Sequence, residues 1–178
     1  LGLPEKDFVD LNPGAPENKG NLAVLAAGTG LGEAIAVWCD ENYHIVATEG
    51  GHTDFAPRNE LEIGLLRYLM AMYPEHVSYE RVVCGQGLVN IYQYLKSIKY
   101  AVGNDGIESR MEKEDPASVI SENGVEGGDK LCSKAMQMFC EIYGAEAGNM
   151  ALKCLPKAGL VLAGGIAAKN LPSMQRGD

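Results

Sequence analysis

The sequence has few aromatic residues, no excess of positive charge and no long hydrophobic run. Its 178 residues carry 15 Lys and Arg against 24 Asp and Glu, a formal net charge of −9. Because phosphate backbones and anionic membrane surfaces attract basic proteins, this balance argues against nucleic acid and membrane partners. The most apolar stretches, 22–27 and 159–168, are far shorter than the roughly 18 residues of a membrane-spanning helix. The composition therefore favours a small-molecule ligand.

Cysteine is also sparse, and its spacing matches neither a disulfide framework nor a zinc site. The five cysteines form an odd set without a Cys-x-x-Cys pair: Cys39, Cys84, Cys132, Cys140 and Cys154. This pattern predicts free thiols in a reducing, cytoplasmic setting. Several of them lie in apolar runs, where a buried cysteine packs as a small hydrophobic side chain.

The chain lacks an initiator Met and the basic and apolar regions of a signal peptide. Prolines and glycines are spread among the polar residues of 1–20, which predicts an extended lead-in. The remaining residues, 21–178, suit one ordinary folded unit. We expect the chain to be either processed or a piece of a longer one.

Short apolar runs near the amino end predict a small antiparallel sheet. Runs 21–26, 34–38 and 44–48 have strand length, and turn-forming residues separate the second from the third, so we expect a three-stranded meander. Later segments predict helices; the expected ranges are from about Asn59, 88–98, from Pro116, and 129–155, with 99–115 as a surface loop. A buried strand is expected over 159–163, so the fold class is α/β.

Two glycine-rich turns each follow a predicted strand. The first contains Gly28, Thr29 and Gly30, where backbone N–H groups can approach an anion without an intervening Cβ. A tight hairpin is the alternative for this loop. Gly164 and Gly165 form the second turn, and the two turns together suit one nucleotide. A Rossmann site is disfavoured because a strand is expected next, and a P-loop because no Gly-Lys-Ser or Gly-Lys-Thr follows.

A third glycine-containing loop carries polar side chains. Glu49 and His52 flank two glycines, so both side chains can project from one tight turn. Carboxylate oxygens accept hydrogen bonds from sugar hydroxyls, and an imidazole donates or accepts. The loop therefore suits a polyhydroxy ligand, with a purely structural histidine as the alternative for His52.

Four strings in this order and spacing resemble the bacterial-type glucokinase family; they span 25–32, 49–57, 80–92 and 162–166. The resemblance covers about 21–168. It implies an actin-like ATPase (ribonuclease H-like) large domain and a sugar held between two closing domains. It further implies ATP-dependent phosphorylation of the 6-hydroxyl of glucose, with ATP and Mg²⁺ as cofactors, in a homodimer.

The resemblance also assigns roles residue by residue. It implies that Glu49, His52 and Glu80 bind sugar hydroxyls. The implied nucleotide-binding positions are Gly28, Thr29 and Gly30 in a phosphate loop, and Gly164 and Gly165 in an adenosine turn. A related group of sugar kinases has a zinc-binding cysteine cluster where this chain has only Cys84, so no structural zinc and no metal-ligating residue are expected.

The departures from the family pattern concern catalysis. The family base is the Asp of an Asn-Asp pair before the Gly-Thr-Gly strand, and residues 1–20 contain no such pair. Asn104-Asp105 lies downstream in a polar segment, so we reject it as the base. The amino-terminal Asp-x-Gly phosphate loop and the closing elements after Gly165 are also missing.

We therefore expect a large-domain fragment, incomplete at both ends, with the small domain absent. It has no catalytic residue of its own and does not turn over, because phosphoryl transfer needs both a base and a complete phosphate clamp. The alternative is a non-catalytic sugar- or nucleotide-binding module of the same fold. A dinucleotide oxidoreductase would require a helix, rather than a strand, after Gly32.

Overall fold

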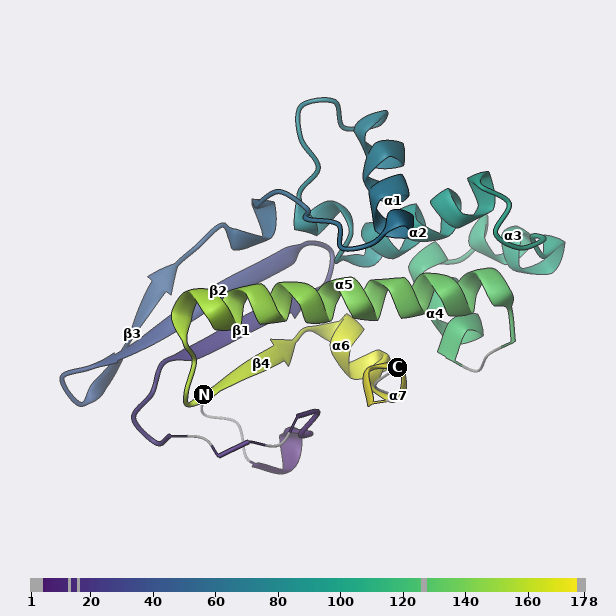
Figure 1. Cartoon of the computed structure of the whole chain (residues 1–178). Helices are drawn as coiled ribbons and strands as arrows, with labels where there is room; N and C mark the ends of the chain where they lie inside the picture. The colour runs from purple at the N-terminus through teal and green to yellow at the C-terminus, as the bar shows by residue number, and fades with distance from the viewer. Residues whose placement is uncertain (1–4, 13, 16, 126–127, 176–178) are drawn as a thin grey trace.

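The computed structural model describes residues 5–12, 14–15, 17–125 and 128–175 (Figure 1). The strands are β1 (Leu22–Ala27), β2 (Leu31–Cys39), β3 (Asn42–Ala47) and β4 (Gly159–Ala163). The α-helices are α1 (Glu60–Met70), α2 (Gly85–Ser97), α3 (Asp105–Met111), α4 (Pro116–Val125), α5 (Lys130–Cys154), α6 (Gly165–Lys169) and α7 (Leu171–Gln175). Three short 3₁₀ turns are η1 (Glu5–Asp7), η2 (Gly50–His52) and η3 (Tyr79–Arg81).

The predicted antiparallel meander is confirmed by the pairing of β1 with β2 and of β2 with β3. β2 begins at Leu31, three residues before the predicted start, because the preceding loop closes within three residues. Gly28 N–H donates to the Gly30 carbonyl oxygen at 2.8 Å, and Leu31 already pairs with Ala27. Gly32 therefore lies in a strand. The oxidoreductase alternative, which requires a helix after Gly32, is wrong.

β4 pairs in parallel with β1, which gives the order β3-β2-β1-β4. Val24 lies opposite Val161, and Ala26 lies opposite Ala163. All five β4 residues are half-buried rather than buried as predicted, because β4 is an edge strand of the described sheet. At the other edge, all six residues of β3 are exposed, and the β2–β3 hairpin projects away from the helices (Figure 1).

Helix α5 crosses one face of the sheet (Figure 1). It starts after Asp129, whose side chain accepts a hydrogen bond from Cys132 N–H, and it ends at Leu155 in the left-handed conformation. The predicted bounds are therefore confirmed. At the carboxyl end of α5 the buried side chains include Glu146 and Met150, while the apolar Leu155 is 65% exposed.

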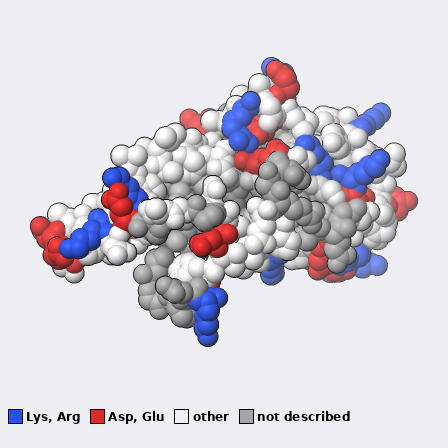
Figure 2. All heavy atoms as spheres, turned by 60° about the horizontal axis from the view of Figure 1, so that its bottom comes forward, with Lys and Arg blue, Asp and Glu red and all other residues white. Residues whose placement is uncertain are grey.

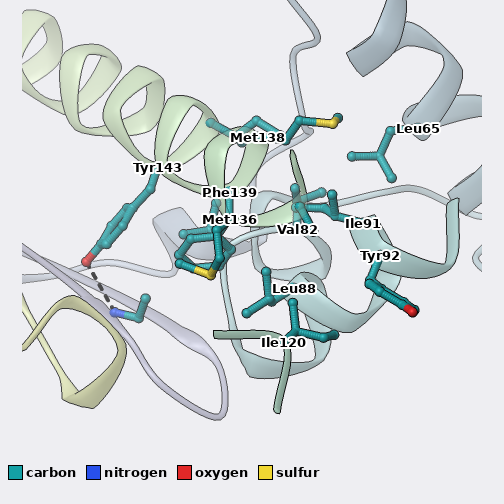
Figure 3. Close-up of a cluster of buried hydrophobic side chains, with 14 of the residues drawn as sticks. Leu65, Val82, Leu88, Ile91, Tyr92, Ile120, Met136, Met138, Phe139 and Tyr143 are labelled. Atoms are coloured by element: carbon teal, nitrogen blue, oxygen red, sulfur yellow. Dashed lines mark hydrogen bonds between the residues drawn. The ribbon is translucent and has the colours of Figure 1, made fainter. Parts of the chain in front are cut away.

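The core lies between α5, α2 and α4, where large apolar side chains meet (Figure 3). Met136 and Met138 are packed in it. Tyr143 points from α5 to β1, where its hydroxyl donates to the Leu25 carbonyl oxygen at 3.0 Å and accepts from Ala27 N–H at 3.4 Å. Burial raises the pKa of Tyr143 to about 12, so this hydroxyl keeps its proton.

Two helix predictions need correction. α2 begins at Gly85 rather than Leu88, since the glycines that suggested a break are its first turn. Gly87 is required there, because a Cβ would overlap the Val82 carbonyl group. The segment 99–115 is not all loop: α3 starts after Asn104, whose side-chain oxygen accepts from Gly106 N–H at 3.0 Å.

The predicted helix starts at Asn59 and Pro116 are confirmed. The lead-in prediction rests in part on residues 1–4, 13 and 16, which lie outside the described residues. No helix among the described residues is long and apolar enough to span a membrane. On the face drawn in Figure 2, acidic and basic side chains lie next to one another at several places, with wide uncharged areas between them.

We predict that Tyr143→Phe lowers the free energy of unfolding by about 1–2 kcal/mol, because it removes a buried hydrogen bond between α5 and β1. Tyr92→Phe is the matched control. Tyr92 is equally buried, and its hydroxyl has no hydrogen-bond partner in the described parts of the chain. Urea denaturation of both variants in the intact protein measures the difference; equal stabilities would contradict the role of Tyr143.

Candidate functional site

The two glycine turns lie next to each other because they follow neighbouring parallel strands. β1 leads into Gly28 and β4 leads into Gly164, with Ala26 and Ala163 in register. Gly164 has φ +89°, and a Cβ there would overlap the Ala27 carbonyl oxygen. Only glycine tolerates both conditions. The structure thus brings together the two turns that are 136 positions apart in the sequence (164 minus 28).

The amino end of α2 lies against the first glycine turn. Gly85 N–H donates to the Gly28 carbonyl oxygen at 2.9 Å, which fixes the helix start beside the loop. An ideal Cβ on Gly85 would also lie 3.8 Å from the Cβ of Ala117, so the first turn of α4 is close by. The positive ends of two helix dipoles therefore lie near this loop, a setting that favours an anion.

Three polar side chains form a second group, with the imidazole between two carboxylates. His52 Nε2 lies 3.9 Å from Glu49 Oε2, and His52 Nδ1 lies 3.9 Å from Glu80 Oε1. The Glu49 side chain is 90% exposed, that of His52 56% and that of Glu80 25%. The group thus offers several accessible hydrogen-bonding atoms to a ligand that has hydroxyl groups.

Backbone hydrogen bonds hold the two turns that carry these side chains together. Asp54 and Ser78 form an isolated antiparallel bridge, and Tyr79 N–H donates to the Thr53 carbonyl oxygen at 2.9 Å. Phe55 N–H donates to the Val77 carbonyl oxygen at 2.8 Å. η2 and η3 are therefore fixed relative to each other, although 27 positions separate His52 from Tyr79.

Glu80 connects the two groups. Its Oε2 accepts a hydrogen bond from Leu31 N–H at 3.0 Å, directly after the first glycine turn. An ideal Cβ on Gly30 would lie 2.5 Å from the same oxygen, so glycine is needed for this approach. One carboxylate thus faces His52 with one oxygen and the backbone of the glycine turn with the other.

The structure therefore groups all the predicted site residues in two adjoining clusters. Glu49, His52 and Glu80 form one, and the turns at 28–30 and 164–165 form the other. Their roles as ligands stay predictions. The rejected Asn104 has a structural use, as the cap of α3.

Two carboxylates near the group of Glu49, His52 and Glu80 were not predicted from the sequence. Glu33 on β2 and Glu146 on α5 each have a buried Oε1 with no hydrogen-bond partner in the described residues. Burial raises the pKa of Glu33, the charge of Glu146 raises it further, and Lys153 partly opposes both effects. A Cβ on Gly50 would overlap Glu33 Oε2, so the turn of η2 lies directly against Glu33. Glu33 could have been found from the sequence, because it places a carboxylate on the core-facing side of β2, opposite Leu25.

The sequence was compared with known protein families and with curated proteins. The sequence profile of the glucokinase family matches residues 1–178. The glucokinase of Nostoc sp. (strain PCC 7120 / SAG 25.82 / UTEX 2576) is 43% identical over 190 residues, which cover 100% of this chain and 56% of that protein. The chain thus spans about half the length of the curated relatives it matches.

Solved structures share the fold. The crystal structure of a glucokinase from an Antarctic psychrotroph has a TM-score of 0.83 and 28% identity, over 98% of this chain and 51% of that one. The glucokinase of Balamuthia mandrillaris, crystallised in complex with glucose, has a TM-score of 0.76 and 24% identity, over 90% and 44%. The expected α/β, actin-like ATPase fold is therefore confirmed.

We predict that Glu33→Gln stabilises the intact protein at about pH 8 and that the gain shrinks as the pH falls towards about 5. The raised pKa means that the native state holds the proton more tightly than the unfolded state. Native stability therefore falls as pH rises through the raised pKa, and glutamine removes that loss.

Thermal melts across this pH range measure the effect, with Glu75→Gln as a control at an exposed carboxylate. A Glu33→Gln effect that does not vary with pH would contradict the prediction.

Proposed function

Because this chain belongs to the glucokinase family, we propose that the intact protein transfers the terminal phosphate of ATP to the 6-hydroxyl of glucose. The observation that carries the proposal is the position of Glu80, whose carboxylate faces His52 and also accepts from Leu31 N–H beside the glycine turn. A sugar bound at this carboxylate lies next to a phosphate bound at that turn. Proximity of the two reactants is what phosphoryl transfer requires first.

Glucose binds at Glu49, His52 and Glu80 in this proposal. The two carboxylates accept hydrogen bonds from sugar hydroxyls, and these charge-assisted bonds are the stronger kind. His52, held between them, donates or accepts according to its tautomer. The complex of the Balamuthia mandrillaris glucokinase with glucose supports this choice of sugar.

ATP binds along the two glycine turns. Gly28, Thr29 and Gly30 receive a phosphate, assisted by the positive end of α2, and Gly164 and Gly165 receive the adenosine. The described residues contain no group of three His, Cys, Asp or Glu side chains suited to a metal. We therefore assign no Mg²⁺ ligand to this part of the chain; Mg²⁺ enters on the ATP phosphates, which supply the oxygen ligands it prefers.

Residues 21–178 form part of the large domain of such an enzyme, and the intact protein is a homodimer. Leu152 and Leu155 support a contact surface at the end of α5, because they are 80% and 65% exposed although apolar. The 178 residues by themselves bind ligands without turnover. This agrees with the lack of an Asn-Asp pair in residues 1–20, before the Gly-Thr-Gly turn.

We predict that Glu49→Gln in the intact protein weakens glucose binding by roughly 5- to 10-fold, because a charge-assisted hydrogen bond becomes a neutral one. ATP binding should change by less than about twofold, since Glu49 lies in the sugar cluster. Isothermal titration calorimetry with each ligand measures both. Unchanged glucose affinity would remove Glu49 from the site.

We also predict that the 178-residue chain shows no glucose phosphorylation in an assay coupled to glucose 6-phosphate dehydrogenase. The reason is that residues 1–20 lack the Asn-Asp pair whose Asp takes the proton of the sugar hydroxyl in the family pattern. The intact protein, assayed in parallel, should be active. Saturable, ATP-dependent turnover by the 178 residues alone would show that the base lies within them.

A further inference from the structure

We propose that Tyr79, Asn149 and Glu146 are positioning residues that hold Glu80 in the orientation needed for the sugar. None of the three belongs to the ligand clusters described above. The inference rests on the proposed function, because Glu80 must be a sugar ligand for its orientation to matter. What the structure adds is a hydrogen-bonded connection from α5 to the turn that carries Glu80.

The connection runs through one amide group. Asn149 Nδ2 donates to the Tyr79 hydroxyl at 3.0 Å and to Glu146 Oε2 at 2.8 Å. Glu146 and Asn149 lie one turn apart on α5, while Tyr79 is the first residue of η3. Tyr79 is 3% exposed and Glu146 is fully buried, so the two residues that accept these bonds are shielded from water, while Asn149 is half-buried.

η3 needs such support because a three-residue 3₁₀ turn has little stability of its own. Its backbone is tied to the Thr53 carbonyl oxygen, and Asn90 on α2 donates to the Arg81 carbonyl oxygen at 2.9 Å. Tyr79 adds the link to α5, and its ring packs edge-on against Phe55. Bonds on both sides of Glu80 thus hold the backbone from which its side chain projects.

The chemistry of Glu146 argues against a packing role alone. A fully buried carboxylate is expensive, and an apolar side chain would fill the same volume at lower cost. The nearest cation, Lys153 Nζ, lies 3.7 Å from Glu146 Oε1, and its side chain is 57% exposed. The other ionisable groups close to Glu146 are Glu33 and Tyr79. A carboxylate retained here is better explained by the hydrogen bond that it accepts.

The same contact controls the Tyr79 hydroxyl. Burial raises the pKa of Tyr79, and the nearby charge of Glu146 raises it further, so the hydroxyl keeps its proton. The Asn149 amide therefore donates to a neutral oxygen with a fixed orientation. Loss of either the Tyr79 hydroxyl or the Glu146 carboxylate releases η3 from α5, while the hydrogen bond from Leu31 N–H to Glu80 remains.

The test compares Tyr79→Phe, Glu146→Ala and the double variant in the intact protein by calorimetry. Each single variant should raise the glucose Kd about fivefold, the loss expected for one buried hydrogen bond, and leave the ATP Kd within about twofold. The double variant should be little worse than either single variant, because both break one connection. Glu146→Gln keeps an acceptor for Asn149 and should restore most of the glucose affinity.

Two controls separate positioning from general loss of stability. Tyr92→Phe removes a buried hydroxyl that has no partner in the described residues, and it should leave both Kd values unchanged. Glu62→Gln breaks an ion pair, at 2.9 Å, between the buried Glu62 carboxylate and the half-exposed Arg58, and it should lower the melting temperature without changing the glucose Kd.

An unchanged glucose Kd in Tyr79→Phe would overturn the proposal, and so would equal losses for glucose and ATP. Wild-type protein that binds no glucose would overturn the proposed function itself. Glucose binding by the wild type therefore tests the function, and the ratio of variant to wild-type Kd tests the positioning.

Discussion

The parallel pairing of β1 with β4 is the constraint on which the rest of the structure depends. It sets Ala26 beside Ala163, so the turns that follow both strands open at the same edge of the sheet. The connection between the strands includes α5, which covers one sheet face and is anchored to β1 by the Tyr143 hydroxyl. Carboxyl ends of neighbouring parallel strands are where α/β proteins bind ligands, and the glycine turns occupy that place.

Glu80 connects the group that contains His52 to the first glycine turn. Its carboxylate is close enough to the glycine turn that Gly30 has no room for a Cβ, yet it also faces His52. Any movement of η3 therefore changes both the position of Glu80 beside His52 and its hydrogen bond to Leu31 N–H. In the proposed site, a sugar that orders Glu80 would also order the backbone at Leu31, beside the first glycine turn. The structure thus connects the group of Glu49, His52 and Glu80 to the glycine turn through one side chain.

Local signals in the sequence were sufficient to predict the helices that begin at a capping side chain and the positions of the glycine turns. Asn59 and Asp129 were read correctly because a capping side chain acts within its own turn. The helical α3 was missed because its cap, Asn104, stands in a polar segment without apolar periodicity. The support of the site was not predictable at all: Tyr79 and Asn149 meet across 70 positions, and no local pattern encodes such a contact.

The most direct test of the account is a crystal structure of the intact protein grown with glucose. We predict sugar hydroxyls within hydrogen-bond distance, about 2.6–3.2 Å, of the side chains of Glu49, His52 and Glu80. We also predict that Glu80 keeps its bond to Leu31 N–H. Glucose bound elsewhere, or bound here without contact to Glu80, would contradict the claim that this carboxylate joins the sugar site to the phosphate loop.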